Sequence, residues 1–281
     1  MAINQMDFDY IRKLVRDRTA LVLSDDKQYL IEFRLSPVLK DIGMRSMQDL
    51  VTHLRISKSS HLQQRVIEAL VTTETLFFRD NHPFAALRQS ILPQLIRQRQ
   101  SDRKLHIWCA ACSSGQEPYS IAMLIREHFP ELASWQLRLM ASDISNQMLE
   151  RAKTGYYSQH EVNRGVPKPL LDRYFQTQGK GWQLSQQIRQ MVDFQQLNLA
   201  APWPQTLPVM DMIFMRNVLI YFDAVTKKAI LKKVRQSLRA DGYLFLGGGE
   251  TTLNLDAAFE PVQIDNVVCF RLRSNHSTNT R

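Results

Sequence analysis

The sequence has few cysteines, no long apolar run and no secretory leader, and each absence narrows what the chain can be. Three cysteines among 281 residues are too few, and odd in number, for a disulfide framework, which favours reduced thiols and a cytoplasmic location. No apolar stretch approaches the ~20 residues that span a bilayer, so no direct membrane insertion is expected. The first ten residues carry aspartates and no apolar run, unlike a signal peptide.

The sequence argues against a metal site, a dinucleotide site and a redox dithiol. The seven histidines show no metal-ligand spacing with the cysteines, so no metal site is expected. The full glycine pattern of dinucleotide-binding proteins is absent, which disfavours a nicotinamide oxidoreductase. Residues 108–112 read Trp-Cys-Ala-Ala-Cys and imitate a redox motif. Both cysteines precede Pro118 by several residues, so they lack the helix N-terminus that lowers the pKa of a redox thiol.

Positive charge is what the sequence has in excess. The net charge is +9 and the isoelectric point is about 9.6. A basic surface attracts acidic partners, among them nucleic acid, an acidic protein surface or an anionic membrane. Because lysine and arginine are spread along the chain, a merely solvated basic face fits equally well.

The N-terminal part of the chain is predicted to be helical. Residues 1–75 are interpreted as a helical domain, because apolar residues recur at helical spacing, as at Phe8, Ile11, Leu14 and Val15. Residues 76–103 are predicted to form a linker and a helix that begins near Pro83.

From residue 104 to residue 273, short apolar strands alternate with helices. This alternation predicts an α/β domain with a mostly parallel, doubly wound, Rossmann-like sheet. Strands are expected at 105–109, 137–141, 211–215, 243–246 and 267–272, with helices from about 117, at 146–153 and at 225–238. Residues 155–194 interrupt the alternation and are interpreted as an inserted β subdomain. The polar residues 274–281 are expected to form a disordered tail.

Polar residues at the ends of the predicted strands mark a ligand site. Small residues follow the first strand and allow a ligand to approach the backbone closely. Glu117, at the start of the next helix, would repel a phosphate but could hold a cationic ligand. Asp143 ends the second strand, where an acid commonly accepts hydrogen bonds from ribose or caps a helix. Arg216 and Asn217 end the third strand and face the same crevice.

Three sequence blocks together resemble the chemotaxis receptor methyltransferases, the CheR family. The blocks are Thr72–Arg79 (TTETLFFR), Trp108–Ser120 (WCAACSSGQEPYS) and Phe214–Asp223 (FMRNVLIYFD). The resemblance extends from about Met6 to Arg273. It implies a class I methyltransferase sheet with an N-terminal all-helical domain and a small inserted β subdomain.

The resemblance also implies a reaction and a site. The expected enzyme is a protein-glutamate O-methyltransferase that uses S-adenosylmethionine, releases S-adenosylhomocysteine and modifies glutamates of chemoreceptors during adaptation. The residues implied to line the cofactor site are Thr73, Thr75, Arg79, Glu117, Asp143, Asn198, Leu199, Arg216 and Asn217. A non-catalytic scaffold with the same fold is the alternative, disfavoured because these strand-end polar residues are all present.

The implied nucleophile is a glutamate carboxylate, which is ionised at neutral pH and needs no general base. Tyr221 is expected to orient it as a neutral group, with Arg79 as a positioner of cofactor and substrate. The expected partner is the cytoplasmic helical bundle of a chemoreceptor, with no nucleic acid bound and the enzyme a monomer.

Receptor recognition is predicted to involve the N-terminal domain. The insertion is short and polar over residues 176–192 and looks more compact than in relatives that grip a receptor tail. Recognition is therefore assigned to the N-terminal helical domain and to a basic segment that contains Arg97, Arg99 and Arg103.

Overall fold

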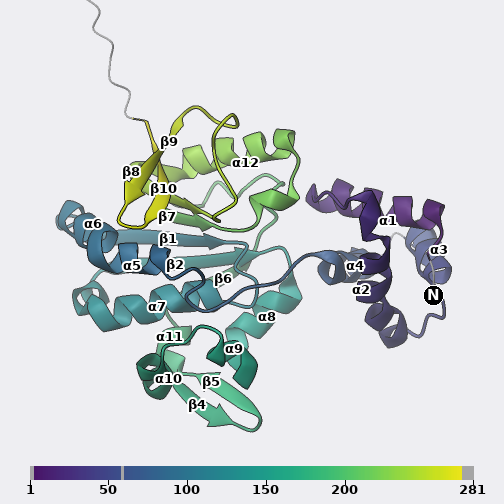
Figure 1. Cartoon of the computed structure of the whole chain (residues 1–281), viewed down its shortest axis with the longest axis horizontal. Helices are drawn as coiled ribbons and strands as arrows, with labels where there is room; N and C mark the ends of the chain where they lie inside the picture. The colour runs from purple at the N-terminus through teal and green to yellow at the C-terminus, as the bar shows by residue number, and fades with distance from the viewer. Residues whose placement is uncertain (1–2, 58–59, 274–281) are drawn as a thin grey trace, which may run out of the picture. The chain divides into compact units, whose positions relative to one another are not determined.

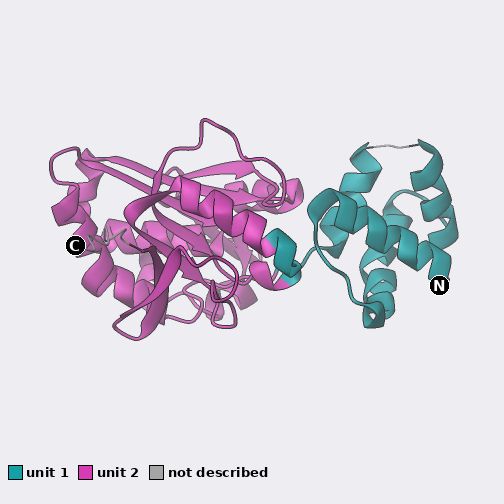
Figure 2. Cartoon of the chain, turned by 90° about the horizontal axis from the view of Figure 1, so that it is seen from above, with its two compact units in different colours: residues 1–73, 221–226 teal, residues 74–220, 227–281 magenta. Residues whose placement is uncertain are grey.

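The computed structural model describes residues 3–57 and 60–273, and the chain divides into two compact units (Figure 2). The first unit comprises residues 1–73 with 221–226, and the second comprises residues 74–220 with 227–281. The sequence interpretation placed the end of the helical domain at residue 75, two residues later than this division. The predicted tail, residues 274–281, lies outside the described residues. Among the residues described, no helix is long and apolar enough to cross a membrane.

The first unit is helical, as predicted. Its elements are α1 (Gln5–Thr19), η1 (Asp25–Lys27), α2 (Gln28–Asp41), α3 (Met47–Ser57) and α4 (Ser60–Leu70). The Asn4 side chain accepts a hydrogen bond from the Asp7 backbone N–H and so caps the start of α1. The predicted apolar stripe of α1 is buried in the core of this unit. Residues 221–226 join the unit because Leu21 forms a β-bridge with Phe222.

The second unit is built on a seven-stranded sheet with the order β6-β2-β1-β7-β8-β10-β9. The strands are β1 (Lys104–Ala110), β2 (Gln136–Asp143), β6 (Val192–Gln196), β7 (Met210–Met215), β8 (Leu238–Leu246), β9 (Phe259–Ile264) and β10 (Val267–Leu272). Strands β6, β2, β1, β7 and β8 run parallel, and β10 pairs antiparallel with both β8 and β9. The predicted mostly parallel sheet is confirmed.

Helices cover this sheet and connect its strands. They are α5 (His82–Ala86), the π-helical η2 (Leu87–Ile91), α6 (Leu92–Gln98), α7 (Gln116–His128), η3 (Pro130–Ser134), α8 (Asn146–Thr154), η4 (Leu219–Tyr221) and α12 (Ala224–Ser237). In Figure 1, α7 and α12 lie on opposite sides of the sheet, as right-handed crossovers in opposite directions require. The single helix predicted from Pro83 thus contains a π-helical turn, just before Pro93, which lacks a backbone N–H.

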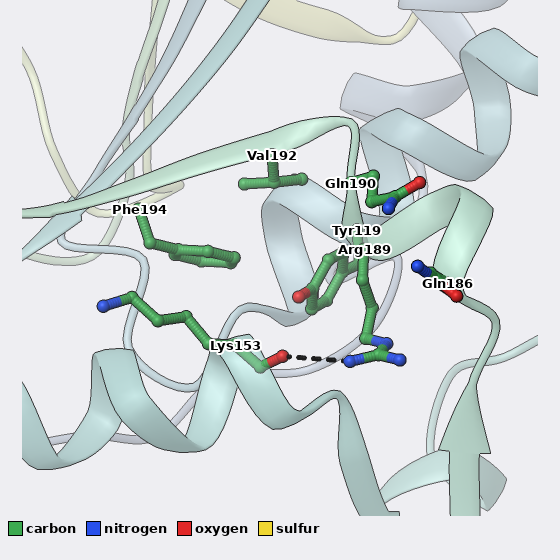
Figure 3. A pocket seen from close by; sticks show the side chains of 7 residues that line it. All are labelled: Tyr119, Lys153, Gln186, Arg189, Gln190, Val192 and Phe194. Carbon is green, nitrogen blue, oxygen red and sulfur yellow. Dashed lines mark hydrogen bonds between the residues drawn. The ribbon is translucent and has the colours of Figure 1, made fainter.

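A small antiparallel sheet is inserted after α8, as predicted. The insertion contains β3 (Tyr156–Ser158), α9 (Gln159–Asn163), α10 (Lys168–Tyr174), β4 (Phe175–Gln178), β5 (Gly181–Leu184) and α11 (Gln186–Arg189), with the strand order β3-β5-β4. Arg189 donates to the carbonyl oxygen of Leu184 at 3.2 Å and to that of Lys153 at 3.4 Å, and Figure 3 shows the second bond. Beside this contact lies a cavity of about 290 Å³, lined by Tyr119, Lys153, Gln186, Arg189, Gln190, Val192 and Phe194.

The structure corrects the sequence interpretation at the edges of the large sheet. The insertion was predicted to extend to residue 194, but Val192–Gln196 forms β6, which pairs in parallel with β2. The edge strand Phe259–Ile264 was not predicted, since its burial alternates along the strand and Pro261 interrupts its apolar pattern. Strand β8 begins at Leu238 rather than at Tyr243, with a register irregularity opposite Met210 and Met212.

A buried ion cluster joins the amino ends of the sheet strands and overturns part of the predicted receptor surface. Arg99 donates from Nε to Asp211 at 2.8 Å and from Nη2 to Asp241 at 2.6 Å. Asp211 also accepts the backbone N–H of His106 at 2.8 Å. Arg99 is 7% exposed, so its assignment to receptor recognition was wrong. Arg97 and Arg103 are both exposed, and Arg103 donates to Ser134 Oγ at 2.6 Å.

Candidate active site

The candidate site lies where the parallel strands end. From β1 the chain crosses to β2 on one side, whereas β7 lies on the other side of β1. In open α/β sheets, ligands bind beyond the carboxyl ends of the strands at such a reversal of strand order. The loops that follow β1, β2, β6, β7 and β8 therefore form the candidate site, and they carry most of the residues predicted from the sequence.

The loop between β1 and α7 has an unusual backbone conformation. Ala111, Ser113 and Gly115 have positive φ angles of 59°, 51° and 93°. A Cβ atom on Gly115 would lie 2.9 Å from the Cβ of Ala152 and 3.1 Å from the ring of Tyr119. Glycine is therefore required there, both for the left-handed backbone and for the contact of this loop with α8.

Asp143 joins this loop to the loop after β2. Its Oδ2 accepts the backbone N–H of Ser113 at 2.8 Å, and its Oδ1 accepts the backbone N–H of Ser145 at 2.9 Å. The residue is 8% exposed. The carboxylate therefore links the loop after β1 to the loop after β2.

Arg216, at the end of β7, lies at the centre of a buried cluster of charges. Its Nη1 donates to Glu117 Oε2 at 2.9 Å, and its Nη2 donates to the Arg79 carbonyl oxygen at 3.1 Å and to the Asp80 carboxylate. Its Nε is buried and has no hydrogen-bond partner among the described residues. A buried donor without a partner costs about 1–3 kcal/mol, so it fits a ligand acceptor at this point.

Burial sets the protonation behaviour of Glu117. Loss of hydration raises the pKa of this carboxyl, and the nearby Arg216 guanidinium opposes the rise. Arg79 also lowers the pKa and Asp80 raises it. An ionised Glu117 supplies a negative charge in a poorly hydrated place, which suits a cationic ligand.

The loop after β7 is held by Glu250, which the sequence analysis did not single out. Glu250 Oε2 accepts the backbone N–H groups of Asn217 and Gly247, both at 2.7 Å, and Oε1 accepts that of Ile220 at 3.2 Å. Asn217 has a φ of 58°, and a Cβ on Gly247 would lie 2.5 Å from its Nδ2. The carboxylate thus stabilises an unusual backbone conformation at a predicted site residue. The glutamate shortly after three consecutive glycines was the available signal.

The loop after β6 carries Asn198 and the buried Leu199, two of the residues that the resemblance implies for the cofactor site. Lys233 of α12 donates to the carbonyl oxygens of Leu199 and Ala201, at 2.5 and 2.7 Å. Burial lowers the pKa of Lys233 to about 8. Its ammonium lies 5.0 Å from the ring centroid of Trp203. Lys233 therefore holds the backbone of this loop against α12.

The remaining predicted residues belong to two different units. Thr75 and Arg79 lie in the second unit with the strand-end loops, whereas Thr73 and Tyr221 belong to the first. Both Thr73 and Tyr221 are half-buried.

The two cysteines of the imitated redox motif are buried beneath this site. Burial raises the pKa of both the Cys109 and the Cys112 thiol well above the ordinary value. Both thiols therefore stay protonated at neutral pH, which disfavours redox chemistry. Within residues 3–57 and 60–273, no group of acidic, histidine and cysteine side chains could hold a metal ion.

Comparison with protein families gives two matches that together span most of the chain. Residues 6–71 match the family described as CheR methyltransferase, all-alpha domain. Residues 73–268 match the family described as CheR methyltransferase, SAM binding domain. The boundary between the two matches falls next to the boundary between the two structural units.

Several curated proteins are similar over nearly their whole length. The chain is 39% identical to chemotaxis protein methyltransferase 1 of Pseudomonas aeruginosa over 97% of this chain and 100% of that protein. It is 37% identical to chemotaxis protein methyltransferase Cher2 of Pseudomonas putida, with the same coverage. It is 33% identical to a chemotaxis protein methyltransferase of Vibrio parahaemolyticus, over 97% of this chain and 99% of that protein.

Proposed function

Because the chain belongs to the CheR methyltransferase family and is an S-adenosylmethionine-dependent methyltransferase, we propose that it esterifies glutamate side chains of chemoreceptors at the strand-end site. One structural observation carries the assignment to this site. The buried Glu117–Arg216 pair combines a carboxylate with an arginine Nε that has no partner among the described residues. An amino acid moiety carries an ammonium, which the carboxylate could accept, and a carboxylate, to which the arginine Nε could donate.

The other loops suit the rest of the cofactor. Asp143 would accept hydrogen bonds from the ribose hydroxyls, and the loop with Asn198 and Leu199 would contact the base. Gly115 keeps the β1 loop packed against α8, which holds this loop in place beside the proposed cofactor site. Asn217, Thr75 and Thr73 complete the proposed set of contacts, and Arg79 is shared between cofactor and substrate.

The proposed reaction needs alignment more than proton transfer. When bound, S-adenosylmethionine supplies a methyl group activated by a positively charged sulfur. An oxygen of the ionised glutamate bonds to the methyl carbon as the carbon–sulfur bond breaks, and that electron pair stays on sulfur. No proton moves, so the site requires no general base. Correct alignment can contribute about 7–11 kcal/mol to lowering the barrier in favourable systems.

Tyr221 and Arg79 are the proposed positioning groups for the glutamate. A neutral hydroxyl, as on Tyr221, orients a carboxylate without the ground-state stabilisation that a tight arginine pair would add. Arg79 contributes a cation near the buried cluster, where it already lowers the pKa of Glu117.

The receptor is the substrate that chemotaxis methyltransferase identity implies, and we place its recognition on the first unit. The hairpin of the insertion is compact, because only Gly179 and Lys180 connect β4 to β5. This compactness disfavours the insertion as the element that grips a receptor tail. Lys40 and Arg45 are exposed at the end of α2 and shortly after it, and can attract acidic helices.

This proposal predicts a base-labile label on receptors. Incubation with methyl-labelled S-adenosylmethionine and receptor-enriched membranes should label the receptor band, and mild alkali should release the label. The initial rate should be the same on matched receptors with and without a C-terminal tail, and should fall as ionic strength rises. Alkali-stable label would contradict ester formation. A large rate loss on tail removal, without salt dependence, would move recognition to the insertion.

Replacement of Glu250 by alanine should slow methyl transfer about tenfold or more, because three backbone N–H groups lose a charged acceptor and the Asn217 loop relaxes. Glu250→Gln should lose less, since its amide oxygen can still accept two of these bonds but its NH2 group cannot accept the third. Steady-state rates at saturating cofactor measure the effect. The control is Glu131→Ala, which removes an exposed carboxylate. A wild-type rate in Glu250→Ala would exclude this role.

A further inference from the structure

The segment Glu74–Asp80, here called the arginine segment, has an unusual backbone conformation. Phe78 and Asp80 have positive φ angles of 49° and 68°, and Asn81 follows with 51°. None of these is glycine, so each conformation is strained unless its surroundings hold it in place. The conformation that presents Arg79 must therefore be imposed by neighbouring elements.

The insertion contacts this segment directly through Gly165, which lies between α9 and α10. A Cβ atom on Gly165 would lie 2.0 Å from the carbonyl oxygen of Phe77 and 2.9 Å from its carbonyl carbon. Both are backbone atoms, so a side chain at this position would force the arginine segment to move. The insertion and the segment are packed backbone against backbone.

Side chains extend this contact in both directions. The buried Phe77 ring packs edge-on against Tyr157 and Phe175 of the insertion, with ring centroids 4.9 and 5.7 Å apart. Arg164 donates to Glu74 at 3.1 Å. Tyr157 also donates its hydroxyl to the carbonyl oxygen of Ser114, at 2.7 Å, in the loop after β1. The insertion thus contacts both the arginine segment and the cofactor loop.

The opposite side of the arginine segment is held by the site itself. The backbone N–H of Phe78 donates to Ser120 Oγ of α7 at 2.9 Å. Arg216 donates to the carbonyl oxygen of Arg79 at 3.1 Å. The segment is therefore clamped between the insertion and the buried charge cluster.

We propose that the inserted β subdomain positions the catalytic arginine segment, with Gly165 and the Phe77 aromatic contacts as the positioning elements. The insertion contributes to methyl transfer through the alignment of Arg79, whether or not it also binds a receptor tail. This inference rests on the proposed role of Arg79 in the methyltransferase site.

The test is Gly165→Ala, measured by steady-state methylation of receptor, by calorimetry with S-adenosylhomocysteine and by amide hydrogen exchange. A displacement of roughly 1 Å at a positioning group can cost ~10²-fold in rate, so kcat should fall by about that factor. The affinity for S-adenosylhomocysteine should fall less, and KM for the receptor should stay unchanged. Amide exchange should accelerate over residues 77–80 and not in the central strands.

Gln187→Ala is the control, because it truncates an exposed side chain on α11 of the same insertion. If Gly165→Ala does not fold, Phe175→Leu is the second test variant, since it keeps an apolar side chain but removes the aromatic contact with Phe77. It should show a several-fold lower kcat and faster amide exchange at residues 77–80. Wild-type kcat and wild-type exchange in a folded Gly165→Ala protein, or in Phe175→Leu, would overturn the proposal. Should receptor methylation fail even in the wild type, the proposed function fails, whereas exchange and calorimetry still test the clamp.

Discussion

Asp211→Ala is expected to lower the free energy of unfolding of the second unit by about 3–5 kcal/mol, the usual cost of removing one partner from a buried ion pair. Asp211 is 1% exposed and accepts bonds from Arg99 Nε and from the His106 backbone N–H, both at 2.8 Å. Without it, the buried Arg99 guanidinium retains only Asp241, whose side chain is 38% exposed. The His106 amide also loses its acceptor at the start of β1.

Denaturant titration of the variant and the wild type measures this loss. The matched control is Asp193→Ala, which breaks the exposed pair with Arg138 at 3.3 Å and should change the free energy by less than about 1 kcal/mol. Asp211 begins β7, whereas the candidate site follows the other end of the strands. The folded variant should therefore bind S-adenosylhomocysteine normally. Equal stabilities of Asp211→Ala and Asp193→Ala would show that the cluster contributes little.

The central strands could be predicted from the sequence because they are buried on both faces and carry continuous apolar runs. Residues 105–109 and 211–215 were expected, and the strands span Lys104–Ala110 and Met210–Met215. The edge strands β6 and β9 lack this signal, since only the first residue of each is fully buried. Their pairing depends on partners that a local pattern does not reveal.

The site was predictable where its residues end strands, and not where they act through distant contacts. Glu117, Asp143 and Arg216 were predicted site residues. They lie in the first turn of α7, at the last position of β2 and directly after β7. The hydrogen bond between Glu117 and Arg216 joins residues 99 apart in the chain, and that between Glu250 and Asn217 joins residues 33 apart. No spacing rule connects such pairs. The steric demand at Gly165 is equally invisible, because it arises only when Phe77 packs against it.

Arg216→Met is expected to weaken S-adenosylmethionine binding by about 10- to 100-fold at neutral pH, since it removes a guanidinium donor and a hydrogen bond to a charged group contributes about 1.5–3 kcal/mol. The Arg216 side chain is 2% exposed and that of Glu117 is 11% exposed, so water compensates poorly for the missing guanidinium. Arg216 lowers the pKa of Glu117, which burial raises. In the variant that pKa rises further, and a larger fraction of Glu117 is protonated at neutral pH.

The pH dependence of S-adenosylmethionine binding tests whether the ionisation of Glu117 controls the affinity. A cationic ligand prefers ionised Glu117, so affinity is present above the pKa of Glu117 and is lost as the pH falls through it. The wild type should lose affinity as the pH falls, and Arg216→Met should lose it at a higher pH than the wild type does. The double variant Glu117→Gln with Arg216→Met should bind S-adenosylmethionine weakly, and its affinity should show no pH dependence from residue 117. Calorimetry from about pH 5 to pH 8.5 measures all three proteins, with Arg235→Met, on the exposed face of α12, as the control. An unchanged affinity and pH profile in Arg216→Met would remove the Glu117–Arg216 pair from the cofactor site.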